Sequence, residues 1–143
     1  MSDVNDVKDV GYKAIRKIQV TDKMVRQFAE MSGDTNPIHL DDEYAKTTRF
    51  KKRIAHGMIL GALLSRLLNE TIGSGGIYLA QTLKFTNPVF IDDIIIFELE
   101  VAKLHKTRGF GTILTTAKKE NGETVMKGEA TIMVSWGIKN LES

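Results

Sequence analysis

The chain has 143 residues, 42% of them hydrophobic, which is enough for one domain with a buried core but short for two. Its 20 basic and 18 acidic residues leave a net charge of +2, so charge gives no reason to expect nucleic acid as a partner. It has no cysteine, which excludes disulfides and a thiolate nucleophile, and its apolar runs are too short to span a membrane. We therefore expect a cytoplasmic globular domain that binds neither nucleic acid nor a membrane.

Residues 1–10 are polar and are expected to form a loose leader, followed by a single domain over residues 11–143. Between residues 11 and 20 hydrophobic and polar residues roughly alternate, which predicts a strand with one buried face. Thr21 is a good helix cap, and hydrophobic residues then recur at helical spacing until the chain nears Gly33. The chain thus opens with a strand and an amphipathic helix.

Two further helices and a run of strands follow. A short helix is predicted over residues 41–47, and a long one over residues 56–71 that is hydrophobic nearly all the way round and should therefore be enclosed. The remainder is predicted to be strand, with a hairpin at Asn121-Gly122. The four predicted strands cover residues 77–85, 94–104, 109–119 and 124–138. This order predicts an α+β domain in which a curved antiparallel sheet wraps around one long hydrophobic helix.

Asp34 and His39 stand five residues apart after the first helix, with Asn36 and Pro37 between them. Asn and Pro favour a tight irregular loop over a helix or a strand. A rigid loop can aim a carboxylate and an imidazole at one substrate atom, so Asp34 and His39 are candidates for a catalytic acid/base pair. Each alone has an ordinary explanation, as a turn residue or a packed histidine, but together they favour catalysis. Asn36 either orients Asp34 or makes only a local turn, and both interpretations stay open.

The tripeptide His56-Gly57-Met58 directly precedes the hydrophobic part of the long helix. The N-terminus of a buried helix presents unpaired N–H groups and the positive end of the helix dipole. The Gly57 N–H is therefore a candidate oxyanion-hole donor to a carbonyl oxygen that gains negative charge, although an ordinary helix-entry glycine is the simpler alternative. His56 is expected to have a capping or structural role.

These residues suit the addition of water to a C=C bond conjugated to a thioester carbonyl, and its reverse. Such a reaction needs a group that takes a proton from water, a proton source for the α-carbon, and a donor to the enolate-like oxygen. No metal and no redox cofactor are required. The acidic run Asp41 to Glu43 fits the first turn of a helix better than a metal site, so we expect no metal. The basic stretch Arg49 to Arg53 could meet CoA phosphates, but we expect it to be solvated surface.

The motif also resembles a known family, the (R)-specific enoyl-CoA hydratases of the MaoC-like dehydratase family. The residues that carry this resemblance are Phe28, Ser32-Gly33-Asp34, Asn36-Pro37-Ile38-His39, Ala45, His56-Gly57-Met58 and Ser65. The resemblance implies a hot-dog fold and a homodimer with acyl-CoA along the subunit interface. It also implies that Asp34 and His39 activate water and supply the α-proton, with Ser65 near the reacting groups; on its own Ser65 would be a helix serine bonded to its own turn.

The resulting prediction is an (R)-specific enoyl-CoA hydratase, or 3-hydroxyacyl-CoA dehydratase, that adds water reversibly to trans-2-enoyl-CoA. One alternative keeps the hot-dog fold but directs water at the thioester carbon, as an acyl-CoA thioesterase. Another is a non-catalytic acyl-CoA-binding module. Release of free CoA, loss of the enoyl group, or binding without turnover distinguishes the three.

Overall fold

A computed structural model of the protein describes residues 8–73 and 76–134. Within these residues, five strands form one antiparallel sheet in the order β1-β3-β4-β5-β2. The strands are β1 (Lys13–Gln19), β2 (Ile77–Phe85), β3 (Ile94–His105), β4 (Phe110–Lys119) and β5 (Thr124–Met133). The helices are α1 (Asp22–Ser32), α2 (Pro37–Leu40), α3 (Asp42–Lys46) and α4 (Gly57–Thr71).

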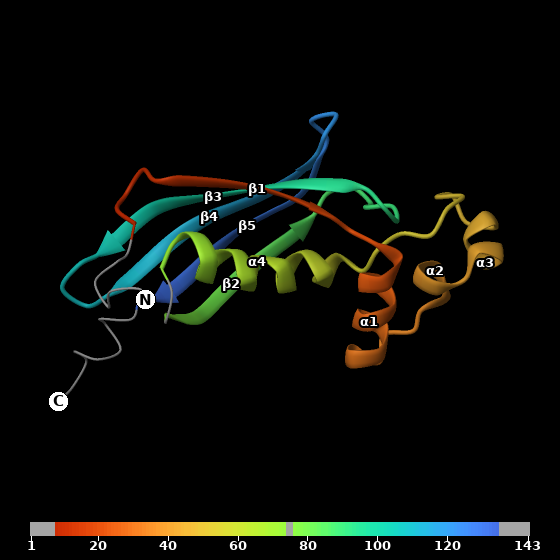
Figure 1. The fold of residues 1–143 in the computed structure, drawn as a ribbon, viewed down its shortest axis with the longest axis horizontal. Helices are drawn as coiled ribbons and strands as arrows, with labels where there is room; N and C mark the ends of the chain where they lie inside the picture. Colours follow the sequence, from red (N-terminus) through yellow and green to blue (C-terminus); the bar gives the residue numbers. More distant parts are fainter. Residues whose placement is uncertain (1–7, 74–75, 135–143) are drawn as a thin grey trace.

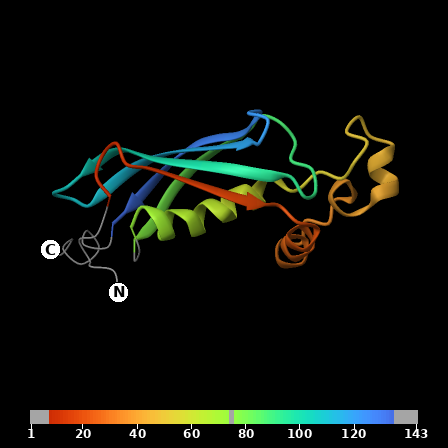
Figure 2. The same ribbon diagram turned by 45° about the horizontal axis from the view of Figure 1, so that its top comes forward.

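The long helix α4 lies along one face of the curved sheet (Figures 1 and 2). Burial alternates along β3, because successive side chains point to opposite faces of a sheet. The inward side chains of β3 join those of α4 in one hydrophobic core, whose fully buried members include Phe97, Leu99, Val101, Leu60 and Leu64. The predicted α+β class and hot-dog arrangement are confirmed.

The prediction that the long helix is enclosed is only partly correct for the single chain. The sheet covers one side of the helix, and the other side stays open: Met58 is 53% exposed, and Ala62 is exposed as well. The neighbouring strand β2 is an edge of the sheet and also carries exposed hydrophobic side chains. No helix in the described ranges, 8–73 and 76–134, is long and apolar enough to cross a membrane.

The predicted starts and ends of the N-terminal elements are confirmed. The Thr21 hydroxyl accepts a hydrogen bond from the Met24 N–H at 3.2 Å, and α1 ends at Gly33 in the left-handed conformation, with φ of 78°. Asp41 caps α3 in the same way, accepting from the Tyr44 N–H at 3.1 Å. The acidic run that opens α3 is thus the first turn of a helix, as predicted.

The predicted irregular loop is only partly correct, because Pro37–Leu40 forms one turn of helix, α2. The Asn36 side chain accepts a hydrogen bond from the Ile38 N–H at 3.2 Å and so caps this turn. Pro37 occupies the first helical position, where its fixed φ suits a helix and its missing N–H costs nothing. The two residues that predicted a loop therefore start a helix instead.

The C-terminal strands follow the prediction closely. The hairpin at Asn121-Gly122 is present, with Gly122 at φ of 90°, and it joins β4 to β5. The predicted extension of the last strand over residues 135–138 lies outside the described residues, as do residues 1–7 of the predicted leader. At the end of that leader, the Lys8 N–H donates to the carbonyl of Ile72 just after α4.

Candidate active site

Two segments that are far apart in the sequence lie side by side at the N-terminal end of α4. They are residues 34–39, the dyad loop, and residues 53–56, the clasp segment. Four hydrogen bonds join them: Arg53 Nη1 to His39 O (3.2 Å), Ile54 N to Ile38 O (3.2 Å), His39 Nδ1 to Ile54 O (2.7 Å) and His56 Nε2 to Asp34 O (2.8 Å). The clasp segment thus fixes the dyad loop at both of its ends, at Asp34 and at Ile38-His39.

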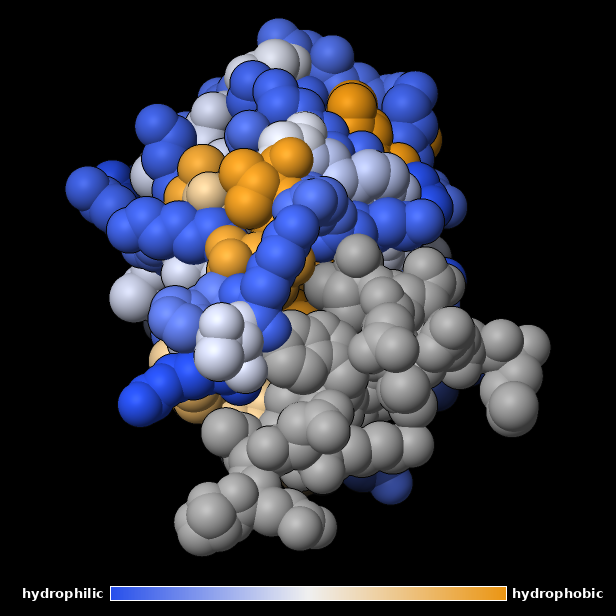
Figure 3. All heavy atoms as spheres, turned by 90° about the vertical axis from the view of Figure 1, so that its left-hand side faces the viewer, coloured by the Kyte–Doolittle hydropathy of each residue, from blue (hydrophilic) through white to orange (hydrophobic). Residues whose placement is uncertain are grey.

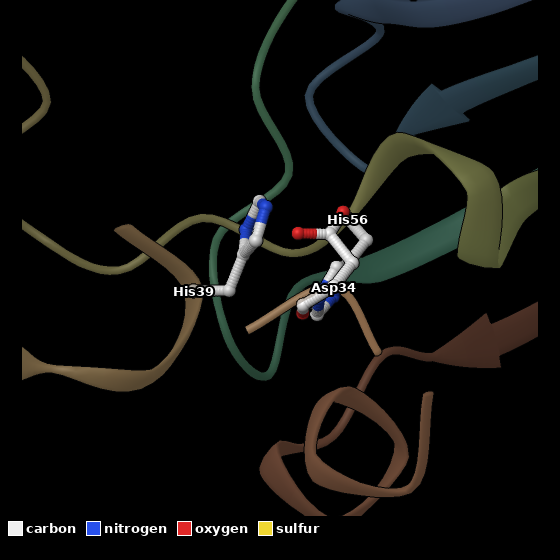
Figure 4. A group of neighbouring side chains, drawn as sticks. All are labelled: Asp34, His39 and His56. Carbon is white, nitrogen blue, oxygen red and sulfur yellow. The ribbon is translucent and has the colours of Figure 1, made fainter. Parts of the chain in front are cut away.

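The structure brings the Asp34 carboxylate and the His39 imidazole together. One oxygen or ring nitrogen from each of Asp34, His39 and His56 lies within 4.8 Å of the others. Figure 4 shows the three side chains gathered between the loop, α2 and the start of α4. One water molecule with ordinary hydrogen bonds to two groups bridges a gap of about 5 Å. The Asp34 and His39 side chains are therefore close enough to hold the same water.

The hydrogen bond between His39 and Ile54 fixes the tautomer of the imidazole. A carbonyl oxygen only accepts, so His39 Nδ1 carries the proton and donates it to Ile54 O at 2.7 Å. The other nitrogen, Nε2, is left with a lone pair when the ring is neutral. Burial lowers the pKa of His39 below its ordinary 6.5, and the nearby His56 lowers it further, while the Ile54 hydrogen bond and the Asp34 carboxylate oppose this. Near neutral pH, Nε2 is a proton acceptor.

His56 supports the dyad loop and does not cap α4. Its side chain makes no capping hydrogen bond, so the predicted capping role is wrong and the structural alternative is supported. The His56 ring stacks on the His39 ring with centroids 3.8 Å apart and packs against the Phe28 ring at 4.9 Å. His56 is only 3% exposed.

Arg53 is the exception in a basic stretch that was expected to be solvated surface. It is 9% exposed, and its guanidinium bonds Asp22 of α1 at 2.7 Å and Asp42 of α3 at 2.9 Å. The Arg53 hydrogen bond holds the pKa of the Asp22 carboxyl below its usual value. Arg53 therefore ties two helices to the dyad loop, whereas Arg49, Lys51 and Lys52 are exposed as predicted.

The first two N–H groups of α4, those of Gly57 and Met58, make no hydrogen bond within the described residues. Neither Gly57 nor Met58 donates to a backbone or side-chain acceptor there, as expected for the uncapped start of a helix. A Cβ at Gly57 would lie 3.0 Å from the Phe85 ring, which is tighter than normal contact. The glycine therefore lets Phe85 of β2 pack close to the start of α4.

A cavity of about 290 Å³ joins His39 to the start of α4. Its wall is mostly hydrophobic and includes His39, Arg49, Ile54, Gly57, Leu60, Phe85 and Val89. Asp34 is exposed and is not part of this wall. Ser65 is not brought to the dyad: it lies eight residues beyond Gly57, about 12 Å along the helix axis, and lines another cavity of about 250 Å³.

Each of the two interpretations of Asn36 that the sequence left open has a matching hydrogen bond in the structure. Its side chain makes a local turn by accepting from the Ile38 N–H, and its own N–H points at Asp34 Oδ1 at 3.4 Å. The second hydrogen bond is long and therefore weak. Asn36 thus acts mainly by starting α2, the turn that carries His39.

The Asp34, His39 and His56 side chains include atoms that commonly bind metals, but their arrangement does not suit one. His39 Nδ1 and His56 Nε2 already donate to backbone carbonyls. The two rings are stacked, with centroids 3.8 Å apart and an angle of 28° between their planes. We keep the expectation that the site works without a metal.

Comparison with known proteins identifies the family. The family model described as MaoC like domain matches residues 5–125 of the chain. The chain belongs to the MaoC-like dehydratase family. An (R)-specific enoyl-CoA hydratase from Aeromonas caviae is 39% identical to this MaoC-like chain over 125 residues, which cover 87% of the chain and 93% of the relative. A 3-hydroxybutyryl-CoA dehydratase from Methylorubrum extorquens is 39% identical over 127 residues, which cover 88% and 80%.

Solved structures have the same MaoC-like fold. The (R)-hydratase from Aeromonas caviae, described as involved in PHA biosynthesis, superimposes with a TM-score of 0.86 at 38% identity, covering 90% of this chain and 98% of that one. An unliganded (R)-hydratase from Pseudomonas aeruginosa gives a TM-score of 0.84 at 43% identity, covering 89% and 82%. The resemblance inferred from the sequence motif is confirmed.

Proposed function

We propose that this protein is an (R)-specific enoyl-CoA hydratase, which adds water reversibly to trans-2-enoyl-CoA and dehydrates 3-hydroxyacyl-CoA in the reverse direction. The observation that carries the proposal is the Asp34–His39 pair, held within reach of one water with His39 Nε2 unprotonated. The names of the relatives from Aeromonas caviae and Methylorubrum extorquens support the same chemistry.

In the proposed mechanism the water lies between the Asp34 carboxylate and His39 Nε2. As the oxygen of this water attacks the β-carbon, its proton moves to Nε2, because this nitrogen has the free lone pair. The Asp34 carboxylate orients the water and stabilises the imidazolium that forms. The pair then returns one proton to the α-carbon, so one water is consumed and the dyad is restored. Dehydration follows the same steps in reverse.

The Gly57 N–H is the proposed donor to the thioester oxygen. Attack at the β-carbon places negative charge on this oxygen, and the free N–H groups at the start of α4 lie at the positive end of the helix dipole. One such donor contributes about 3 kcal/mol of transition-state stabilisation. The cavity that contains both Gly57 and His39 supports this role, because an enoyl thioester would reach the two groups together.

The proposed substrate is an acyl-CoA thioester, processed in the cytoplasm without a metal or redox cofactor. Arg49 in the cavity wall offers a positive charge to the phosphates of CoA. Gly57 and Ala55 admit the narrow thioester, and the hydrophobic wall suits the acyl chain.

We also propose that the protein pairs into a homodimer through β2 and the open face of α4. Strand β2 is an edge of the sheet with unpaired backbone groups, and three of its hydrophobic side chains, Ile77, Leu79 and Phe85, are 45% to 47% exposed. Hydrophobic side chains also interrupt the hydrophilic surface at the end of the molecule seen in Figure 3. Leu79→Lys should convert the dimer to a folded monomer in analytical ultracentrifugation. Ile15→Lys on β1, the opposite edge, is the matched control and should leave the dimer intact.

The function is tested in one assay with crotonyl-CoA as substrate. Loss of the enoyl absorbance without release of free thiol, with (R)-3-hydroxybutyryl-CoA as the product, is the expected result. Release of CoA, detected with a thiol reagent, would instead identify the thioesterase alternative. Binding of crotonyl-CoA with neither reaction would identify an acyl-CoA-binding module.

A further inference from the structure

His56 is a buried side chain for which the proposed mechanism has no chemical step. It is 3% exposed, and its ring lies between the rings of His39 and Phe28. Its Nε2 donates to the backbone carbonyl of Asp34 at 2.8 Å. One side chain therefore contacts both members of the dyad, through a ring face on His39 and a hydrogen bond on Asp34.

The other ring nitrogen of His56 shows that packing alone does not explain this residue. His56 Nδ1 is buried and has no hydrogen-bond partner among the described residues. A buried polar atom without a partner destabilises a fold. Phenylalanine would fill the same place between two aromatic rings without this cost. What histidine supplies and phenylalanine lacks is the N–H that holds the Asp34 carbonyl.

Asp34 depends on this hydrogen bond because the rest of its support is local. Its N–H donates to the Ser32 hydroxyl at 3.1 Å, and among residues 8–73 and 76–134 its carboxylate accepts only the long bond from Asn36. Both partners lie only two residues away and are exposed, Ser32 at the end of α1 and Asn36 in the dyad loop. Within the part of the chain that the structure describes, His56 is the residue distant in sequence that hydrogen-bonds to Asp34.

We propose that His56 is the positioning residue of the dyad, which holds Asp34 through its carbonyl and keeps the His39 ring in the orientation that presents Nε2 to the water. This inference rests on the proposed hydratase function. A residue that does not touch the substrate can still affect the rate by positioning a reacting group, because a displacement of that group by about 1 Å lowers the rate by about 100-fold. The expected loss is thus in kcat, with little change in KM.

Two variants separate positioning from packing. His56→Phe keeps a ring in the stack and removes the hydrogen bond, whereas His56→Gln keeps an N–H donor at the same reach and removes the ring. We expect His56→Phe to melt at or above the wild-type temperature, with kcat for crotonyl-CoA lowered by about 10- to 100-fold and KM within about twofold. His56→Gln should melt lower than His56→Phe and yet have the higher kcat. If His56 had a purely structural role, the variant with the lower melting temperature would also have the lower kcat. That result would overturn the proposal, and so would a wild-type kcat in His56→Phe.

Amide hydrogen exchange gives a readout that does not need turnover. If His56 holds the loop, exchange at Thr35 and Asn36 should be faster in His56→Phe than in the wild type and should recover in His56→Gln. Unchanged exchange in His56→Phe would contradict the positioning role. If the wild-type protein hydrates no enoyl-CoA, the hydratase proposal is wrong. The hydrogen-exchange result would still decide, independently, whether His56 holds the loop.

Discussion

The sheet with α4 and the helical end that carries the dyad loop are stabilised in different ways. In the first region, side chains such as Phe97, Leu99 and Leu64 are fully buried in one hydrophobic core. In the second, the Asp34 side chain is exposed, and the loop is fixed by the four hydrogen bonds of the clasp segment and the Arg53 ion pairs. Hydrophobic burial is strong and tolerant of small shifts, whereas hydrogen bonds are weaker and set geometry. Changes in the core should therefore affect stability most, and changes at the helical end should affect activity most.

The largest expected effect is on activity, at the dyad itself. Asp34→Ala and His39→Ala should each lower kcat/KM for crotonyl-CoA hydration by about 10²- to 10⁴-fold, because each removes one party to the proton transfer. The double variant should be little worse than either single one, since the two groups act as a unit. Circular dichroism should show the wild-type fold in all three. Near-normal rates in both single variants would contradict the assignment.

The second effect is on stability, in the core. Leu99→Ala removes a side chain that is 0% exposed and distant from the dyad loop in the sequence, on β3. It should lower the free energy of unfolding by about 3 kcal/mol, measured by urea denaturation. The rate per folded molecule should stay close to that of the wild type. A large loss of rate in folded Leu99→Ala would mean that the two regions are not independent.

Arg53→Met should affect both properties at once, because Arg53 joins the helices to the loop. The methionine keeps the hydrophobic stem but removes the bonds to Asp22, Asp42 and His39 O. Since a hydrogen bond to a charged group contributes about 1.5–3 kcal/mol, we expect a loss of about 2 kcal/mol. The rate should fall by roughly tenfold as the loop loosens. Lys23→Met, an exposed change on α1, is the control. It should leave the unfolding free energy and the rate within experimental error of the wild-type values.

The smallest effect is the pH dependence set by His39, whose pKa is lowered below 6.5 mainly by burial. The kcat/KM profile should stay level through pH 6.5 and fall only at lower pH, where Nε2 takes up a proton. The stability also depends on the protonation of His39. Between pH 6.5 and the lowered pKa, the unfolded chain binds a proton at His39 that the folded chain does not. Unfolding free energy should thus decrease as pH falls through this window, and less so in His39→Gln. An acid limb centred above pH 6.5 would contradict the lowered pKa of His39.

The different ways in which the core and the helical end are stabilised also decide how much of each could be predicted from the sequence. The strands and α4 were predictable because hydrophobic periodicity is written along each element, as in β3. Asp34, His39 and Gly57 could be named as candidates from the sequence because residue types with acid/base and donor chemistry stand close together in the chain. The clasp segment was not found, since its bonds to the loop use backbone carbonyls that leave no mark in the sequence. Arg53 looked like part of a surface charge run, and only the fold brings Asp22 and Asp42 to it. Asn36-Pro37 predicts a loop but starts a helical turn, because the same dipeptide can begin either structure.

The central claim is that the clasp segment holds His39 with its proton on Nδ1, so that Nε2 faces the water as a base. Nitrogen-15 NMR of the histidine rings in the wild-type protein tests this most directly, because the two ring nitrogens of a neutral imidazole have distinct shifts. We predict that His39 is neutral at pH 7, with Nδ1 protonated and Nε2 bare, and that Arg53→Met and His56→Phe leave this tautomer detectable but less populated. A His39 ring protonated on Nε2 at pH 7 would contradict the account.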